Sequence, residues 1–425
     1  MFEDIKGKKL LIVGGEASIT NIVREAKAMG VYTIVAERGT DLNKLPAKAI
    51  ADEAWDFDYS ATEALAAKCR EAGVDGVFTG YSEGKLYYAA RLAEALGTPF
   101  YATSEQVEIT RNKRSFKELC MKYGIPVPHE YCKSGKMTEE EKAAVRFPVI
   151  VKPADYGGRI GISLCTERAD LDEALALAES KSISHSVVVE EYIEGLELSA
   201  IYTIADGEYS LSIINDKYLS QEGKKYCLCD AAITPSKYYD RYMKEVDPRI
   251  KDFLRGIGIR NGIAVFQLIA NEEKITAFEM ALRLNGGNDW MVLEQCNGIN
   301  YMRMLIHFTL TGSMGDTLEK DDPTFKNEFV TTYIVYAHGG KVAEIDLGGI
   351  ETMEGLMGIS RYVYVGKEII DKGTTQQRVF SFKVRTKTME DLADKIRYIQ
   401  DQLVVKDTEG RNMLFGRFDA SRILW

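Results

Sequence analysis

The sequence predicts a mixed fold, of class α/β and α+β, in which an amino-terminal doubly wound parallel layer precedes α+β regions. Three observations lead to this expectation. Strand-like and helix-like segments alternate over residues 1–103, as in a parallel sheet with crossover helices. Residues 263–288 contain two strand-like runs joined by a tight polar turn. Residues 328–425 alternate strand-like runs with an amphipathic helix, which indicates a smaller α+β unit. The expected strands are Phe329–Tyr336, Arg361–Val365 and Val379–Val384, and the expected helix is Met389–Leu403.

The amino-terminal elements follow from local apolar patterning. Lys9–Val13 is an expected strand, Ile19–Met29 is an expected helix after a Gly-Gly turn, and Val31–Ala36 is a second strand. The alternation continues through Tyr101. Because each strand is followed by a helix, successive strands can pair in parallel with helices on both faces of the sheet. We therefore expect a doubly wound domain over residues 1–103.

Two polar side chains are expected to meet on one face of the hairpin in residues 263–288. Gln267 and Glu279 lie on runs separated by the turn Asn271–Lys274, and the second run alternates as a half-buried strand does. Carboxylate and amide oxygens are ligands for a hard cation such as Mg²⁺. Arg283, four residues after Glu279, would face the same anion. The alternative is an ordinary core hairpin with one surface ion pair.

A glycine-rich loop follows a short apolar strand in the segment Pro148–Ser163. Glycine lets backbone N–H groups approach a phosphate closely, and basic side chains beside it supply charge. The spacing differs from that of a Walker A loop. The pattern indicates a phosphate-covering loop, with a plain turn as the alternative. Its candidate residues are Lys152, Gly157, Gly158, Arg159 and Gly161.

The run Val187–Glu197 is an apolar strand that ends in a polar segment. An adenine ring needs an apolar slot with backbone donors and acceptors, and a carboxylate a few residues later can bind ribose hydroxyls. These requirements point to a nucleotide-binding segment. Its candidate residues are Glu190, Glu191, Ile193 and Glu197.

Lys113, in the run R-N-K-R, lies in an expected helix, Thr110–Tyr123. In chain order, these residues, together with Lys113, resemble the ATP-grasp superfamily. The branch of carbamoyl-phosphate synthetase large subunits and amino-acid ligases is the most similar. The resemblance extends over roughly Met1 to Leu310 and implies a two-lobed ATP-grasp domain followed by a carboxy-terminal α+β domain. The implied boundaries are 104–312 for the ATP-grasp domain, about 104–184 and 185–312 for its lobes, and 328–425 for the last domain. The segment 313–327 is polar, acidic and without periodic pattern, so we expect a linker there.

The resemblance implies how a nucleotide would be held. Lys113 and Lys152 match the cationic positions that contact ATP phosphates. The segment Glu190–Ile193 matches the strand that pairs with adenine, and Glu197 matches the acid that binds ribose.

The resemblance also implies the metal and catalytic residues. Gln267 and Glu279 match the ligands of Mg²⁺ or Mn²⁺, and Arg283 matches the arginine that steadies an acyl-phosphate. Ala281 departs from the usual pattern, since an asparagine that binds a second metal commonly stands there. An asparagine of the following N-G-G-N run could replace it, although a turn is the simpler interpretation of that run.

The composition agrees with a soluble multidomain enzyme, and we expect the chain to be cytoplasmic. At 425 residues and 45% apolar content, the chain is long enough for about three packed domains. Its 54 basic and 64 acidic residues give a net charge of −10 without a basic block, so nucleic acid is not an expected partner. No apolar run reaches the ~18 residues of a membrane span, and the acidic start is unlike a signal peptide. Seven scattered cysteines indicate reduced thiols, and zinc is not expected.

Together the motifs imply an ATP-dependent carboxylate–amine ligase that acts through an acyl-phosphate and releases ADP and phosphate; an amino-acid ligase is one such enzyme. One alternative is a carboxyphosphate-forming carboxylase of the purine or biotin carboxylase kind. Another is a non-catalytic ATP-binding regulatory protein, which Ala281 allows. The substrates would be a small carboxylate and an amine, and a homodimer is expected by analogy. The tyrosine- and lysine-rich stretch 210–247 and Trp290 are substrate-binding candidates, with ordinary sheet tyrosines as the alternative for the stretch.

Overall fold

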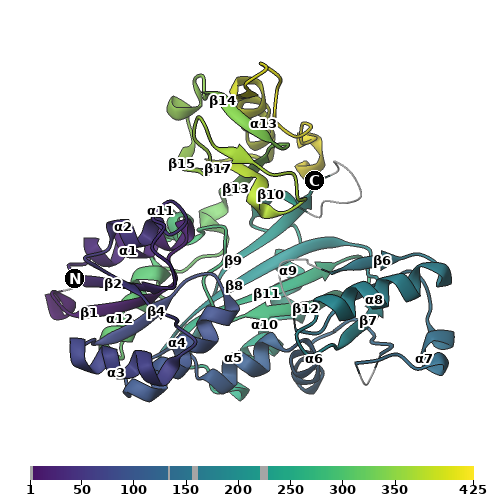
Figure 1. Cartoon of the computed structure of the whole chain (residues 1–425). Helices are drawn as coiled ribbons and strands as arrows, with labels where there is room; N and C mark the ends of the chain where they lie inside the picture. Colours follow the sequence, from purple (N-terminus) through teal and green to yellow (C-terminus); the bar gives the residue numbers. More distant parts are fainter. Residues whose placement is uncertain (1–2, 133–134, 156–160, 221–227) are drawn as a thin grey trace.

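The structure is a computed structural model that describes residues 3–132, 135–155, 161–220 and 228–425. A long sheet lies at the centre, with an amino-terminal layer on one side and a small lobe on the other (Figure 1). The carboxy-terminal layer stands above them in the same view. Among the described residues, no helix is long and apolar enough to cross a membrane.

The amino-terminal layer is a parallel four-stranded sheet in the order β3-β2-β1-β4. Leu10 and Ile12 of β1 belong to a core with residues of α1 and α12, whereas Leu11 and Val13 belong to a core with residues of α3 and α4. Helices therefore cover both faces, as a buried parallel sheet requires. The elements are β1 (Lys9–Val13), α1 (Thr20–Ala28), β2 (Tyr32–Glu37), α2 (Pro46–Ile50), β3 (Glu53–Asp56), α3 (Thr62–Ala72), β4 (Gly76–Thr79), α4 (Glu83–Leu96) and α12 (Tyr301–Thr311).

Two helices lead into the small lobe. The sequence predicts one helix from Thr110 to Tyr123, but the structure divides it at Asn112. The Asn112 side chain accepts the backbone N–H groups of Arg114 and Ser115 and so begins a new helix. The lobe itself is an antiparallel sheet, β6-β5-β7, that shares a core with α8. The elements are α5 (Ser104–Arg111), α6 (Lys113–Lys122), α7 (Glu139–Ala144), β5 (Val149–Pro153), β6 (Ser163–Cys165), α8 (Leu171–Lys181) and β7 (Val187–Glu191).

The central sheet has eight strands in the order β12-β11-β8-β9-β10-β13-β17-β15. Antiparallel pairing of β10 with β13 joins the second lobe to strands of the proposed carboxy-terminal domain. Strands β13, β17 and β15 continue the sheet of the second lobe. A separate carboxy-terminal domain over residues 328–425 therefore stays a proposal. The elements are β8 (Leu196–Ala205), β9 (Glu208–Leu219), β10 (Cys229–Thr234), α9 (Tyr239–Glu245), α10 (Asp247–Gly256), β11 (Gly262–Ala270), β12 (Ile275–Ala281), α11 (Trp290–Asn297), β13 (Phe329–Tyr336), β15 (Leu356–Arg361) and β17 (Arg378–Thr386).

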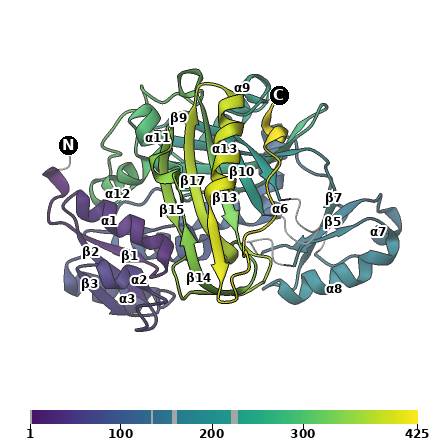
Figure 2. The ribbon, with the colours of Figure 1, turned by 90° about the horizontal axis from the view of Figure 1, so that it is seen from above.

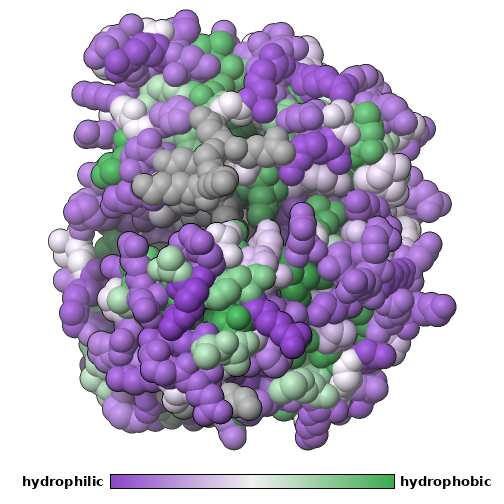
Figure 3. Space-filling view, turned by 90° about the vertical axis from the view of Figure 1, so that its right-hand side faces the viewer, coloured by the Kyte–Doolittle hydropathy of each residue, from purple (hydrophilic) through white to green (hydrophobic). Residues whose placement is uncertain are grey.

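The carboxy-terminal layer covers the far end of this sheet. Its helix α13 shares a core with β13 and β17 and lies along these strands in Figure 2. A second sheet, β16-β14-β18, lies beside it. Figure 3 shows a largely hydrophilic surface on the side of the small lobe. The remaining elements are β14 (Gly340–Asp346), β16 (Glu368–Ile369), α13 (Met389–Gln402) and β18 (Val404–Asp407).

Candidate active site

Gln267 and Glu279 lie directly opposite each other on β11 and β12, with a bulge after Gln267. Opposed residues of an antiparallel pair point to the same face, so the amide and the carboxylate are offered together. Both residues are half-buried. Over the described ranges, no group of three or more His, Cys, Asp and Glu side chains is placed to hold a metal ion. A cation at this pair would therefore also need oxygens from substrate or water.

Two lysines from other elements approach this pair. Lys113 begins α6 and Lys152 lies on β5, and their exposed fractions are only 8% and 5%. Burial lowers the pKa of Lys113, the carboxylate of Glu279 opposes this effect, and the charge of Lys152 adds to it. The ammonium of Lys152 contacts the carboxylate of Glu190 on β7. Four candidate residues from four elements therefore share one electrostatic neighbourhood.

A third lysine, Lys117, lies outside the sequence motifs but belongs to the same cluster. Its Nζ is 2.6 Å from Glu190 Oε2 and 2.7 Å from Glu130 Oε2. Burial acts to lower the pKa of Lys117, but Glu190 and Glu130 outweigh it and raise the pKa. For Glu190, burial acts to raise the pKa, whereas Lys152 and Lys117 lower it. Glu190 is therefore an ionised carboxylate between two ammonium groups. Lys117 follows Lys113 by four residues, a spacing that places both on one face of a helix.

The rest of the expected nucleotide segment follows the junction between the small lobe and the central sheet. Glu191 accepts the backbone N–H of His129 at 3.1 Å and pairs with Lys274 in the β11–β12 turn at 3.0 Å. Ile193 is buried, and Glu197 is the second residue of β8. The Glu191 side chain therefore holds the two sheets together, while Glu197 lies on the strand next to β11.

An open groove of about 870 Å³ borders this junction. Its lining includes Lys117, Glu191 and Lys274, but neither residue of the metal-ligand pair. The groove therefore lies beside the expected nucleotide segment and does not contain the oxygen ligands on β11 and β12.

Gly161 is the part of the glycine-rich loop that the structure describes. The other loop candidates, Gly157, Gly158 and Arg159, lie outside the described residues. The φ angle of Gly161 is +74°, and a Cβ at this position would lie 3.0 Å from the Lys181 side chain. A larger residue would be both strained and crowded there. Gly161 is therefore required by the backbone path at the end of the loop, whatever the loop binds.

Arg283 lies just after β12, where the central sheet meets the amino-terminal layer. Its Nη2 is 3.1 Å from Glu83 Oε1 at the start of α4, and its Nη1 donates to the Leu284 carbonyl at 3.0 Å. Its Nε has no acceptor among the residues described. Ala281 is buried and offers no side-chain oxygen. Glu83, which no sequence motif marked, therefore orients Arg283 while one guanidinium donor stays available for an anion.

The two asparagines of the N-G-G-N run are engaged within the protein. Asn285 donates to Asp289, and its Oδ1 accepts the Tyr301 hydroxyl at 3.3 Å. Asn288 Oδ1 accepts the Tyr81 hydroxyl at 2.9 Å. A metal could use either oxygen only by displacing a tyrosine, which favours the interpretation of this run as a turn.

Part of the stretch 210–247 has a plain structural explanation. Tyr218 is buried on β9. Asp216 on the same strand is buried and accepts hydrogen bonds from the Ser236 hydroxyl and, at 3.2 Å, from the backbone N–H of Lys237. Burial raises the pKa of Asp216 to about 6. Sheet packing therefore accounts for these two residues without a substrate; residues 221–227 lie outside the described part of the chain.

Comparisons with known proteins show that the chain is similar to several ligases and to a synthase. Residues 120–226 match the family model described as D-ala D-ala ligase C-terminus. The chain is 26% identical over 238 residues to the D-alanine--D-alanine ligase of Xanthomonas axonopodis pv. citri, which is 52% of this chain and 70% of that protein. It is 23% identical over 262 residues to the carbamoyl phosphate synthase large chain of Clostridium acetobutylicum, which is 57% of this chain and only 23% of that protein. An L-amino acid ligase from Bacillus licheniformis shares the fold, with a TM-score of 0.78 and 19% identity over 95% of this chain and 99% of that one.

Proposed function

Because the chain belongs to the ATP-grasp superfamily, we propose that it is an ATP-dependent carboxylate–amine ligase. ATP phosphorylates a small carboxylate, and an amine then attacks the acyl-phosphate, which releases ADP and phosphate. The nucleotide binds together with Mg²⁺ or Mn²⁺. We favour an amino-acid ligase, because a ligase of that kind shares the fold over nearly the whole chain.

The observation that carries this proposal is the meeting of oxygen ligands and buried cations from separate segments. Gln267 and Glu279 are paired across β11 and β12. The charge of Glu279 acts on Lys113, which also senses Lys152. Phosphoryl transfer needs a divalent cation held by hard oxygen ligands and positive groups around the phosphates. The residues present therefore fit a nucleotide bound with a divalent cation.

Each residue has a part in the first step. Bound Mg²⁺ or Mn²⁺ would supply charge that withdraws electrons from the phosphate oxygens. Gln267 and Glu279 would hold it through their side-chain oxygens. Lys113 and Lys152 neutralise the phosphoryl oxygens as a substrate carboxylate oxygen bonds to the γ-phosphorus and the bond to ADP breaks. Glu190 orients Lys152 through their contact.

The second step forms the new bond between carbon and nitrogen. The amine nitrogen bonds to the acyl carbon, the carbon–oxygen bond to phosphate breaks, and a proton leaves the nitrogen. Arg283 stabilises the negative oxygen that develops on the acyl group. Its ion pair with Glu83 limits the orientations of the guanidinium.

The test is a screen of purified protein for ADP and phosphate release, with ATP, Mg²⁺, pooled amino acids and pooled small carboxylates. Mass spectrometry should find a product with the mass of the acid plus the amine minus one water. Release should require both substrates and should fall in Arg283→Lys. Release with bicarbonate in place of the acid would favour the carboxylase alternative. No release with any combination would refute the ligase proposal.

A further inference from the structure

Two cations of β17 contact the loop that follows Arg283. The Lys383 ammonium donates to the carbonyl oxygen of Gly287. Arg378 Nη1 lies 3.5 Å from the carbonyl oxygen of Gly286, to which it donates. The carboxy-terminal layer therefore reaches the same loop as the proposed catalytic arginine, although β17 is about a hundred residues farther along the chain.

The positive charge at this contact is only partly balanced. Lys383 is 2% exposed and lies 4.0 Å from the carboxylate of Asp289. Burial lowers the pKa of Lys383, Asp289 opposes this effect, and Arg378 adds to it. Within the described ranges, no ion pair joins Arg378 to a carboxylate; the neutral hydroxyls of Tyr336 and Tyr362 are its side-chain hydrogen-bond partners, and its Nε has no acceptor. Shielding a guanidinium from water without a counter-charge is costly, so this position favours an anion from solution.

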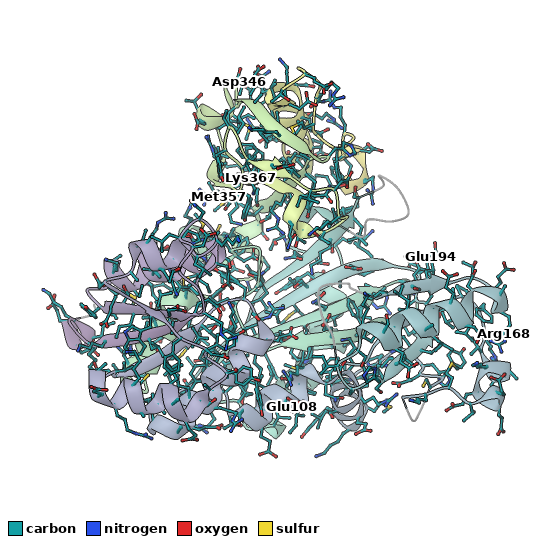
Figure 4. All side chains as sticks on the ribbon, viewed as in Figure 1. Glu108, Arg168, Glu194, Asp346, Met357 and Lys367 are labelled. Carbon is teal, nitrogen blue, oxygen red and sulfur yellow. The ribbon has the colours of Figure 1, made fainter. Side chains whose placement is uncertain are left out.

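The surroundings of Arg378 place that position between layers of the protein. Its guanidinium lies 5.3 Å from the ring centroid of Tyr362, just after β15. Tyr81 brings the amino-terminal layer to the same loop. Met357, labelled in Figure 4, marks the nearby contact with α11, where its carbonyl accepts Gln295 Nε2 at 3.1 Å. Three layers of the protein therefore surround the half-buried Arg378, and part of its side chain is exposed to solvent.

We propose that Arg378 binds a carboxylate carried by the amine substrate, so that this substrate is an amino acid. This inference rests on the ligase function proposed above. Arg283 acts at the acyl group, whereas Arg378 contacts Gly286, three residues later, and three extended residues span at most roughly 10 Å. The two arginines therefore contact one short stretch of chain, and we place the nitrogen of the amino acid at the acyl carbon and its carboxylate at the Arg378 guanidinium. The planar guanidinium can donate two parallel hydrogen bonds to a carboxylate.

Lys383 has a different part in this arrangement. It contacts the loop, Asp289 and, at 3.3 Å, the Thr332 hydroxyl on β13, so it is a positioning residue that holds the Gly287 carbonyl in place. The ligand-binding role is therefore assigned to Arg378 alone, and the test is made at that residue.

The test is thermal melting of the full chain with Mg²⁺ and β,γ-methylene-ATP, which cannot transfer its γ-phosphoryl group in the usual way. One sample receives the pooled standard amino acids, and another receives the corresponding amino-acid amides, which keep the amine but lose the carboxylate. The amino acids should raise the melting temperature by about 2 °C or more above the nucleotide alone, and the amides should not. In Arg378→Met the response to amino acids should fall while the response to nucleotide remains.

Arg361→Met is the matched control. Arg361 ends β15 and lies 5.6 Å from the ring centroid of Phe380 on β17, but it is exposed and does not contact the loop. Its variant should respond as the unmodified protein does. If Arg378→Met does not fold, Arg378→Lys keeps the charge but not the planar fork, and its response to amino acids should be weaker.

Several results would overturn the assignment. They are equal stabilisation by amino acids and amides, no response to either pool while the nucleotide still stabilises, or an undiminished amino-acid response in the Arg378 variants. For the amine found in the product, the variant should raise KM roughly 10- to 100-fold and change kcat little. Failure of the ligase proposal would look different, because ATP would then yield no ADP with any acid and amine.

Discussion

Replacing Asp216 by Asn should change how the stability of the protein depends on pH. Burial raises the pKa of this carboxyl from 3.8 to about 6. The folded state therefore holds the proton more tightly than the unfolded chain does. The free energy of unfolding falls as the pH rises between these two pKa values, and it is constant above them. A difference of about two pKa units corresponds to about 3 kcal/mol of stability that the carboxyl removes at neutral pH.

Urea unfolding of the unmodified protein and of Asp216→Asn, at several pH values between about 4 and 7, measures this change in the free energy of unfolding. An asparagine can accept the backbone N–H of Lys237 and donate to the Ser236 hydroxyl, so the fold should persist. The stability of Asp216→Asn relative to the unmodified protein should rise by up to about 3 kcal/mol over this range. Asp240→Asn, at an exposed position, is the control. Parallel pH curves for the unmodified protein and Asp216→Asn would refute the reasoning.

Three further predictions concern the candidate site. Lys152→Ala should weaken ATP binding in isothermal titration, because it removes a charge-assisted phosphate contact. Glu190 keeps Lys117 as a partner in this variant. An unchanged affinity for ATP would reject the assignment of Lys152 on β5 as a phosphate contact. Glu279→Gln should raise the Mg²⁺ concentration needed for half-maximal ADP release, because a neutral amide replaces a charged ligand. An unchanged Mg²⁺ requirement would exclude Glu279 as a ligand. Arg283→Lys should still bind ATP but lose turnover by roughly 10²-fold or more at saturating Mg²⁺; normal turnover would remove its oxyanion role.

Much of the fold could be predicted because its signals are local. The strands Lys9–Val13 and Phe329–Tyr336 agree with their predicted ranges, since their apolar patterns are set by neighbours in sequence. A strand was expected at Arg361–Val365, but β15 covers Leu356–Arg361, because pairing with β17 selects the earlier run. A single side chain, Asn112, divides what apolar spacing presents as one helix.

The separate motifs of the candidate site could be predicted from the sequence more readily than their proximity in the folded protein. Gln267 and Glu279 lie in one hairpin, so strand pairing alone brings them together. The other nucleotide motifs come from segments that no local pattern connects, and the resemblance to a superfamily supplied their order. Lys117 carried a usable signal in its helical spacing. Arg378 and Lys383 carried none, because only the tertiary packing of β17 brings them to the loop.

The pairing of β10 with β13 has a consequence for synthesis of the chain on the ribosome. Roughly a hundred residues separate these strands, which at usual translation speeds is on the order of 5–20 s. Throughout that delay, β10 is the last strand of an incomplete sheet, and its open backbone groups can recruit a strand of another nascent chain. A chain truncated before residue 328 would lack β13, so this edge of β10 would stay unpaired permanently. Such a fragment should therefore aggregate, even though it would keep every residue proposed to bind the nucleotide.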